Sequence, residues 1–206
     1  MTVLPARPFY LVRHGQTDAN VAQLISGGCE ATLTDEGRRL ADHLGDHMDQ
    51  VLPAPVLIIH SDRTRTRETA NLLNKKLNLP TETHVGMDEH NFGDWIGKPV
   101  NPFFHRVHAG ETPPGGESVP VFAARVGRVM KPLLETKPGP LLFVAHNGTF
   151  RAFAHLYGLP VWSVTNGILH YFEPVEGKFP WRVWKWTPEN GKMRREQVIF
   201  ESTDHT

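Results

Sequence analysis

Histidine and arginine side chains follow short apolar runs at two distant points of the sequence. Arg13 and His14 come directly after the apolar run 9–12, and His146 comes directly after the apolar run 141–145. An arginine fork holds two oxygens of a phosphate group and keeps its charge, and a neutral imidazole ring is a nucleophile. These residue types therefore predict a site that binds a phosphate group and accepts it on a histidine.

A third cluster adds positive charge to the predicted site. Arg63, Arg65 and Arg67 alternate at the start of a predicted helix, whose amino end favours a bound anion. No glycine-rich loop of the Walker type is present, so side chains have to hold the phosphate. We expect Arg13, Arg65 and a protonated His146 to stabilise the oxygens of a transferring phosphoryl group. Arg63 or Arg67 is an alternative that would share the role of Arg65.

The predicted site also needs an acid, because the leaving oxygen of a phosphate ester takes up a proton. Glu89, which lies in a stretch without clear periodicity, is our candidate. Four other acidic residues of the same region compete with it: Asp88, Asp94, Glu111 and Glu117.

Alternating strands and helices must position these side chains. Short apolar runs predict buried strands, and apolar residues at helical spacing predict helices. The predicted strands are 9–12, 56–59, 81–85, 141–145, 168–172, 182–186 and 197–200, and the predicted helices follow Thr34, Ser61, Ser118 and Gly148. This alternation predicts an α/β fold, a three-layer αβα sandwich around a mostly parallel sheet. The carboxyl ends of parallel strands share one edge, where the three clusters should meet.

The length of 206 residues predicts one domain, residues 1–206. The prolines and glycines of about 86–117, which show no clear periodicity, predict an irregular insertion or lid there. Twenty-two basic and 22 acidic residues give zero formal charge, which disfavours a nucleic-acid partner. Cys29 is the only cysteine, so no intrachain disulfide can form. The sequence contains no signal peptide and no apolar run long enough for a membrane span, so we expect a cytoplasmic protein.

Six segments, taken in order, resemble the sequence blocks of the histidine phosphatase superfamily, in its phosphoglycerate-mutase-like branch. The first holds Arg-His-Gly followed by x-Thr-x-x-Asn, and the last holds the second histidine. The six segments are 11–20, 33–37, 61–70, 89–97, 116–118 and 144–148.

The resemblance implies a phosphoglycerate-mutase-like fold and a role for each matching residue. His14 would be the nucleophile that forms a phosphohistidine, and Glu89 would protonate the leaving group and then help a water molecule attack. Arg13, Arg65 and His146 would complete the phosphate pocket. Five further residues would contact phosphate or substrate: Asn20, Ser26, Gly27, Asn147 and Gly148. No metal or other cofactor would be needed.

The resemblance leaves three functions open. The first is hydrolysis of a small phosphorylated metabolite, the second is a cofactor-dependent phosphoglycerate mutase, and the third is a non-catalytic phosphate-binding module. Only 18 residues separate Gly97 from Gly116, whereas the mutases resemble longer chains here, which favours hydrolysis. The sequence departs from the family at Arg63, often leucine, and at Thr66, often alanine. Asp94 and Ile96 stand on either side of Trp95, where the family frequently has acidic residues, and the departure there concerns substrate contacts.

Several remaining features have plain structural interpretations. His43 and His47 lie at a spacing that could bind a metal, but we expect them on a solvated helix face. His105 and His108 would contact an acidic substrate or be exposed. The tryptophans of the late strands are expected to pack, and any exposed ones are where a homodimer would form. Cys29 is expected to be inert.

Overall fold

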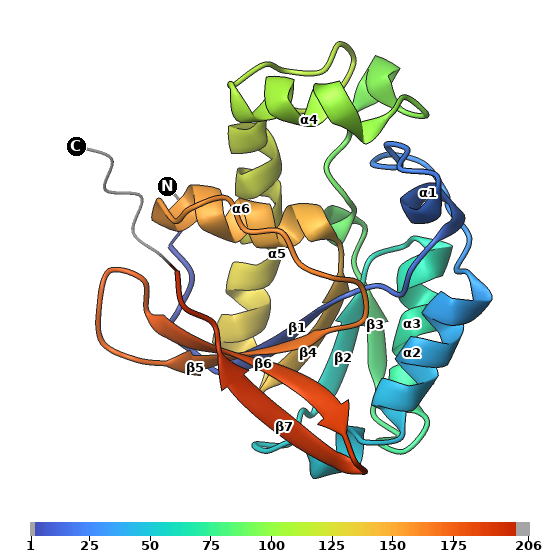
Figure 1. Ribbon diagram of the computed structural model, residues 1–206. Helices are drawn as coiled ribbons and strands as arrows, with labels where there is room; N and C mark the ends of the chain where they lie inside the picture. Colours follow the sequence, from blue (N-terminus) through green and yellow to red (C-terminus); the bar gives the residue numbers. More distant parts are fainter. Residues whose placement is uncertain (1–2, 201–206) are drawn as a thin grey trace.

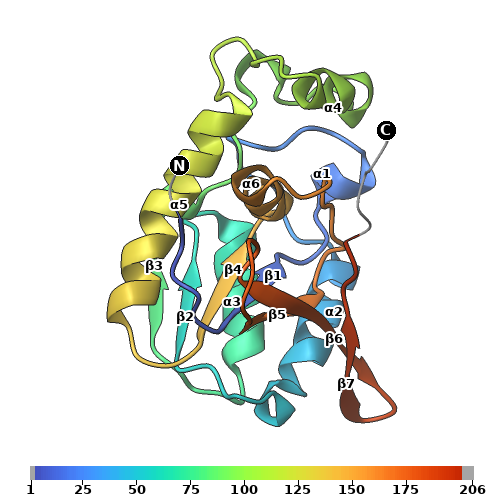
Figure 2. The same ribbon diagram turned by 90° about the vertical axis from the view of Figure 1, so that its left-hand side faces the viewer.

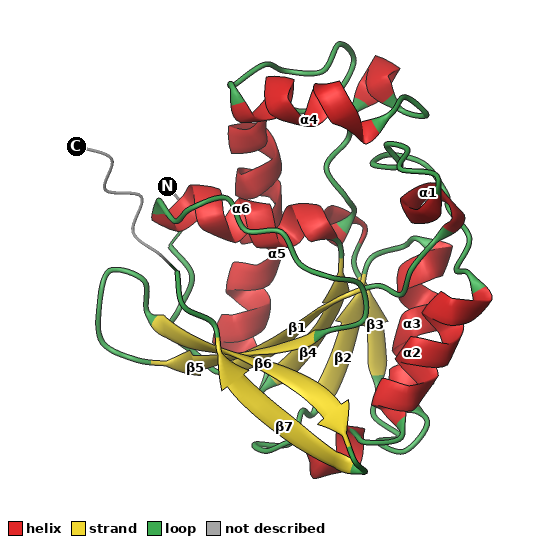
Figure 3. Cartoon of the chain, viewed as in Figure 1, coloured by secondary structure: helices red, strands yellow, loops and turns green. Residues whose placement is uncertain are grey.

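The computed structural model describes residues 3–200, in which seven strands form one sheet in the order β3-β2-β4-β1-β5-β6-β7 (Figure 3). The strands are β1 (Phe9–Arg13), β2 (Leu57–His60), β3 (Thr81–Thr83), β4 (Leu141–Ala145), β5 (Leu169–Pro174), β6 (Trp181–Glu189) and β7 (Lys192–Gln197). The helices are α1 (Asp18–Val21), α2 (Asp35–Gly45), α3 (Thr64–Asn74), α4 (Val100–His108), α5 (Val119–Thr136) and α6 (Asn147–Tyr157). Short 3-10 turns cover Met48–Gln50, Val85–Met87 and Gly93–Trp95.

The centre of the sheet is parallel, as predicted. β4 lies between β1 and β2 and pairs with both in parallel, whereas β5 runs antiparallel to β1. β6 and β7 continue the sheet in antiparallel fashion, so β6 again runs in the direction of β1. Arg13 is in register with Ala145, and His60 with Val144. The residues that follow β1, β2 and β4 therefore leave the sheet at one edge.

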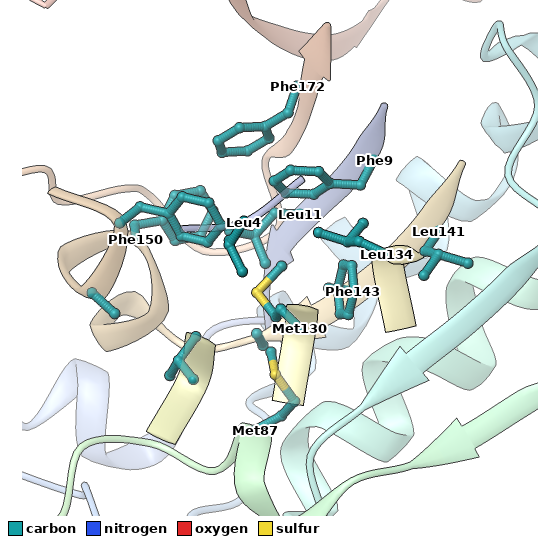
Figure 4. Packing of buried hydrophobic residues seen from close by; sticks show 14 of the residues in the cluster. Leu4, Phe9, Leu11, Met87, Met130, Leu134, Leu141, Phe143, Phe150 and Phe172 are labelled. Carbon is teal, nitrogen blue, oxygen red and sulfur yellow. The ribbon is translucent and has the colours of Figure 1, made fainter. Parts of the chain in front are cut away.

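Alternating side chains of the central strands enter two separate cores, which gives the three-layer sandwich. Phe9 and Leu11 of β1 pack under α5 and α6, whereas Tyr10 and Val12 pack under α2 and α3. Figure 2 shows these helices on opposite sides of the sheet. Figure 4 shows Phe9 and Leu11 in the first core, close to Met130 of α5. Burial of each such side chain stabilises the fold by roughly 1.5–3 kcal/mol.

The prediction that residues 86–117 are irregular was wrong for α4. In Figure 1 this helix lies beyond α6, near the α1 segment. It carries apolar residues on one face, and Val107 packs with Trp95 and Ile25 in a third, small cluster. Pro102 lies in the first turn of α4, where a missing backbone N–H costs little. The prolines at its start had obscured the helical spacing of these apolar residues.

The late strands also differ in detail from the prediction. The last strand is β7 and ends at Gln197, so 198–200 lies outside it. Trp181 and Trp186 are only 3% and 8% exposed, because they pack on the two opposite faces of the sheet. They are therefore core residues and provide no exposed contact for a homodimer.

Candidate active site

His14 leaves the end of β1 as a buried side chain, only 4% exposed. Its backbone N–H donates to the carbonyl of Ala145 at 3.0 Å, which fixes it beside the end of β4. Its ring nitrogen Nδ1 lies 2.7 Å from the carbonyl oxygen of Gly15. A carbonyl oxygen only accepts, so Nδ1 carries the proton and Nε2 keeps its lone pair. The backbone thus selects the tautomer that a nucleophilic histidine needs.

The His14 ring is also held in its neutral form. Burial lowers its pKa well below the ordinary value, and the positive charges of Arg65 and Arg13 lower it further. The hydrogen bond to Gly15 opposes this shift without reversing it. Because the pKa lies below neutrality, His14 is unprotonated at pH 7 without any neighbouring base.

His146 directly follows β4 and lies against His14, with 5.3 Å between the ring centroids. It is completely buried, and its Nε2 lies 2.8 Å from the Ser61 hydroxyl. Burial and then the charge of Arg65 lower its pKa well below the ordinary value. Burial therefore favours the neutral ring here, which offers a hydrogen bond, and the protonated His146 expected during phosphoryl transfer stays a prediction.

Ser61 has a different role from the one predicted. It was expected to begin the following helix, but α3 begins at Thr64 with Arg63 in the capping position and no side-chain cap. The Ser61 hydroxyl instead contacts both Thr66 and His146, at 2.8 Å each. This arrangement anchors the Nε2 side of His146, whose Nδ1 is buried and has no hydrogen-bond partner.

Two arginines flank the histidines. Arg65 is 1% exposed, and its Nη1 donates to the carbonyl of Cys29 at 2.8 Å. Arg13 donates through Nη1 to the carbonyl of Val164 at 2.7 Å. The Nε groups of both arginines and Nη2 of Arg65 are buried without a partner. Both guanidinium groups are therefore anchored at one nitrogen and have further donors for an anion.

The structure distinguishes among the three alternating arginines. Arg63 is held by both carboxylate oxygens of Asp88, with Nε 2.8 Å from each. Arg67 is exposed on the outer side of α3. Of the three, only Arg65 is buried and close enough to His14 to influence its pKa.

Glu89 is the acidic residue that lines the same pocket as Arg13 and His14. Its Oε2 accepts from the Gly148 N–H at 3.3 Å, and its Oε1 accepts from the His90 N–H at 2.8 Å. A Cβ at Gly148 would lie 1.9 Å from Glu89 Oε1, so only glycine allows this carboxylate to approach α6.

The four competing acids are occupied or lie elsewhere. Asp88 pairs with Arg63, although its Oδ1 also comes within 3.7 Å of His146 Nε2. Glu117 pairs with Arg125 and Glu111 with Arg106, and Asp94 is exposed.

Four of the residues expected to contact the substrate line the pocket, but they differ in whether their side chains are free to bind a ligand. Asn20, Ser26, Gly27 and Asn147 all line it. Asn20 Oδ1 accepts from the backbone of Thr17 and from Asn166, so its NH2 group is the one left for a ligand. The Asn147 side chain is engaged with Ser163 and with the N–H of Val164. It therefore holds the loop after α6 rather than a phosphate.

Three residues of the site were missed from the sequence. Asn166 Nδ2 donates to the carbonyl oxygen of His14 at 2.9 Å, and Phe104 and Arg151 line the pocket. Arg151 was detectable in principle, because it lies four residues after Asn147 and so on the same face of α6. Phe104 depends on α4, which was not predicted.

The histidines outside the pocket have structural positions. His47 is 9% exposed, and its Nδ1 donates to the carbonyl of His43 at 2.9 Å. The prediction that both residues lie on a solvated helix face is therefore confirmed for His43 and wrong for His47. His105 and His108 are exposed on α4. Across residues 3–200 we find no group of three or more side chains suited to bind a metal ion. No helix in this part of the chain is long and apolar enough to cross a membrane.

The sequence also matches the model of a known protein family. Residues 9–187 match the family model of the histidine phosphatase superfamily (branch 1), and the chain belongs to that superfamily. It is thus an enzyme of the phosphatase class.

Several named phosphatases are similar to the chain. It is 30% identical over 184 residues to a glucosyl-3-phosphoglycerate phosphatase of Mycobacterium tuberculosis, covering 79% of this chain and 82% of the relative. It is 29% identical over 168 residues to the adenosylcobalamin/alpha-ribazole phosphatase of Escherichia coli, covering 73% and 79%.

Solved structures agree with these relatives. The crystal structure of the alpha-ribazole phosphatase from Shigella flexneri superposes with a TM-score of 0.72 at 27% identity, covering 85% of this chain and 95% of that one. A mycobacterial glucosyl-3-phosphoglycerate phosphatase in complex with VO3 superposes with a TM-score of 0.73 at 26% identity, covering 96% and 100%.

Proposed function

We propose that this protein hydrolyses the phosphomonoester of a small metabolite through a phosphohistidine at His14. One observation carries the proposal. Seven buried side-chain polar atoms of the described residues have no hydrogen-bond partner, and five of them belong to Arg13, Arg65, His146 and Arg151. Arg13 and Arg151 line the His14 pocket, whereas Arg65 and His146 lie close to His14 itself. Buried donors are normally paired, so this concentration of unpaired donors near His14 indicates a site built for an anion with several oxygens.

In the first step, His14 Nε2 attacks phosphorus while the bond from phosphorus to the ester oxygen breaks. The Gly15 carbonyl keeps the proton on Nδ1, so the attacking nitrogen needs no deprotonation. Arg13 and Arg65 hold the equatorial oxygens with fixed positive charge. Glu89 donates its proton to the leaving oxygen, and the alcohol departs.

In the second step, water replaces the histidine. Glu89, now ionised, takes a proton from the water molecule as its oxygen attacks phosphorus. The phosphorus–nitrogen bond breaks, and its electron pair returns to His14 Nε2. Inorganic phosphate leaves, and the enzyme regains its starting charge. Neither step requires a metal ion, because side chains supply the positive charge.

We propose that the chain forms a single domain, of which the structure describes residues 3–200, and that 86–117 acts as an insertion over the pocket. Phe104 of α4, within this insertion, lines the pocket that also contains His14. The names of the relatives include glucosyl-3-phosphoglycerate and alpha-ribazole phosphatases, and a phosphorylated metabolite fits a pocket partly covered by α4.

We also propose a location and an oligomeric state for the protein. A cytoplasmic location is proposed from the single cysteine, which excludes an intrachain disulfide. A homodimer is also proposed, but its contact would have to lie away from the buried Trp181 and Trp186.

The proposal is tested by measuring inorganic phosphate release in excess EDTA. We expect the wild-type protein to hydrolyse p-nitrophenyl phosphate under these conditions. With 3-phosphoglycerate, we expect phosphate release to exceed formation of 2-phosphoglycerate, because a water molecule rather than the product receives the phosphoryl group. Faster isomerisation would assign the protein to the mutases, and loss of all activity in EDTA would replace this mechanism by a metal-dependent one.

A further inference from the structure

The segment between α6 and β5 runs back to the end of β1 (Figure 1). Its Gly167 N–H donates to the carbonyl of Arg13 at 3.0 Å, and its Val164 carbonyl accepts from Nη1 of Arg13 at 2.7 Å. Between these two contacts, Asn166 places its side-chain amide against the residues that directly follow Arg13. The two reaction steps proposed for the pocket do not use Asn166.

The Asn166 amide nitrogen lies within hydrogen-bond distance of three oxygen atoms. The carbonyl oxygen of His14 is 2.9 Å from Nδ2, Oδ1 of Asn20 is 3.1 Å away, and the carbonyl oxygen of Gly15 is 3.3 Å away. Backbone carbonyls only accept, so the NH2 end of the amide must face them and the flipped orientation is excluded. One side chain therefore holds both the backbone of the nucleophile and a second residue of the pocket.

The peptide unit that joins His14 to Gly15 is held at both ends. Its carbonyl oxygen accepts from Asn166, and its N–H donates to Oγ1 of Thr69 at 3.0 Å. Because a peptide unit is planar, these two bonds fix its orientation. Gly15 needs such a restraint, because glycine has the most backbone freedom of any residue. A larger residue cannot replace it, since a Cβ would lie 2.7 Å from the carbonyl oxygen of Gly37.

The orientation of this backbone decides which nitrogen of His14 carries the proton. The Gly15 carbonyl oxygen receives the Nδ1 proton at 2.7 Å, which leaves Nε2 with its lone pair. Once the peptide unit is released, the carbonyl turns away and the ring protonates at either nitrogen. The tautomer with the proton on Nε2 has no lone pair there to attack phosphorus. Asn166 thus acts on the nucleophile through the backbone, without touching the substrate.

The second contact of Asn166 sets the direction of the Asn20 amide. Oδ1 of Asn20 accepts from the Thr17 N–H and from Asn166, both at 3.1 Å. The NH2 group of Asn20, which lines the pocket, is therefore the end left for a phosphate oxygen. Without Asn166, one hydrogen bond alone opposes a flip that would present an oxygen to the anion.

We infer that Asn166 is a positioning residue of the reaction pocket, which fixes the tautomer of His14 and the amide direction of Asn20 from 152 residues further along the chain than His14. This inference rests on the proposed function, because the tautomer matters for catalysis only if His14 is the nucleophile.

The alternative role of Asn166 is to anchor the segment between α6 and β5 and nothing more. A residue with only that role lowers the melting temperature when it is removed, but it leaves the chemistry of the folded protein unchanged. The proton position on the His14 ring and the rate of the folded variant therefore distinguish the two roles.

The proton position is measured by nitrogen-15 NMR of the histidine rings at pH 7, and the signals of His14 are identified by their absence in His14→Ala. We expect wild type to show a protonated Nδ1 and an unprotonated Nε2. In Asn166→Ala the two signals should move toward each other, as in a mixture of tautomers. Thr165→Ala removes an exposed side chain of the same segment and is the matched control, which should keep the wild-type signals.

The rate is measured with p-nitrophenyl phosphate in excess EDTA, below the melting temperatures of all variants. Loss of the two shortest hydrogen bonds of Asn166 should lower kcat by about 10- to 100-fold, whereas Thr165→Ala should keep the wild-type rate. Asn166→Ala should also raise KM, but it should add little to the KM of Asn20→Ala, because both changes act on the same amide.

The outcomes separate this inference from the proposed function. A wild-type His14 ring protonated on Nε2, or a folded Asn166→Ala with unchanged ring signals and kcat, overturns the positioning role while phosphate release still supports the phosphatase. No phosphate release by wild type overturns the proposed function, and the ring signals, which need no turnover, still test Asn166. If Asn166→Ala does not fold, Asn166→Ser takes its place, because its shorter hydroxyl offers one donor instead of two. Its His14 signals should move in the same direction, and wild-type signals contradict the inference.

Discussion

Replacing His14 by alanine is expected to lower kcat for p-nitrophenyl phosphate in excess EDTA by at least about a hundredfold. The reason is that Nε2 of His14 forms the covalent bond to phosphorus, and no other nucleophile of the pocket has both a neutral ring and a tautomer fixed by the backbone. The measurement is the initial rate of p-nitrophenolate release at saturating substrate.

The matched control for this variant is His43→Ala, because His43 is an exposed histidine of α2. It should retain wild-type activity, and it also tests the alternative in which His43 and His47 bind a catalytic metal. Thermal unfolding of both variants identifies any loss that comes from instability. Retention of more than about a tenth of the activity in His14→Ala would assign the nucleophile to another group.

Replacing Glu89 by glutamine is expected to produce the second largest effect, and the effect should depend on the leaving group. An alkoxide needs a proton as it leaves, so hydrolysis of glycerol 3-phosphate should fall by about 10²- to 10⁴-fold. p-Nitrophenolate leaves without a proton, so the first step should survive with p-nitrophenyl phosphate. The second step still lacks its base, and p-nitrophenolate should therefore appear as a burst followed by a slow steady state.

Glu111→Gln is the control for Glu89→Gln, since Glu111 is an acid of the same insertion that pairs with Arg106 outside the pocket. It should behave like wild type with both esters. Equal losses for the two esters without a burst would mean that Glu89 positions the site through Gly148 rather than transferring protons.

The fold was predictable because apolar runs and helical spacing are local signals. The runs that became β1, β2 and β4 are buried on both faces, so they are apolar at nearly every position and easy to recognise. α4 was missed because its apolar face covers the pocket rather than the sheet, and prolines interrupt it. β7 was predicted at 197–200 but lies at Lys192–Gln197, because the strand is largely exposed and polar and no burial pattern marks it.

The candidate site was predictable as far as its residues lie at the ends of strands. His14 and His146 each follow a strand of the predicted parallel sheet, and parallel strands end at one edge, so they were predicted to lie close together. The structure confirms that they are adjacent. The protonation state of His146 depends on its complete burial, which no local pattern reveals. Arg151 was missed because it lies within α6, beyond the strand ends from which the site was predicted.

The central claim, a covalent phosphohistidine at His14, is tested most directly by trapping the intermediate. Glu89→Gln would be mixed with p-nitrophenyl phosphate in excess EDTA, quenched in alkali during the slow phase and mapped by peptide mass spectrometry. The expected result is one phosphoryl group on the peptide that contains His14, stable to alkali and lost in mild acid. Steady turnover with no phosphorylated peptide, or a phosphoryl group on a different residue, would contradict the mechanism.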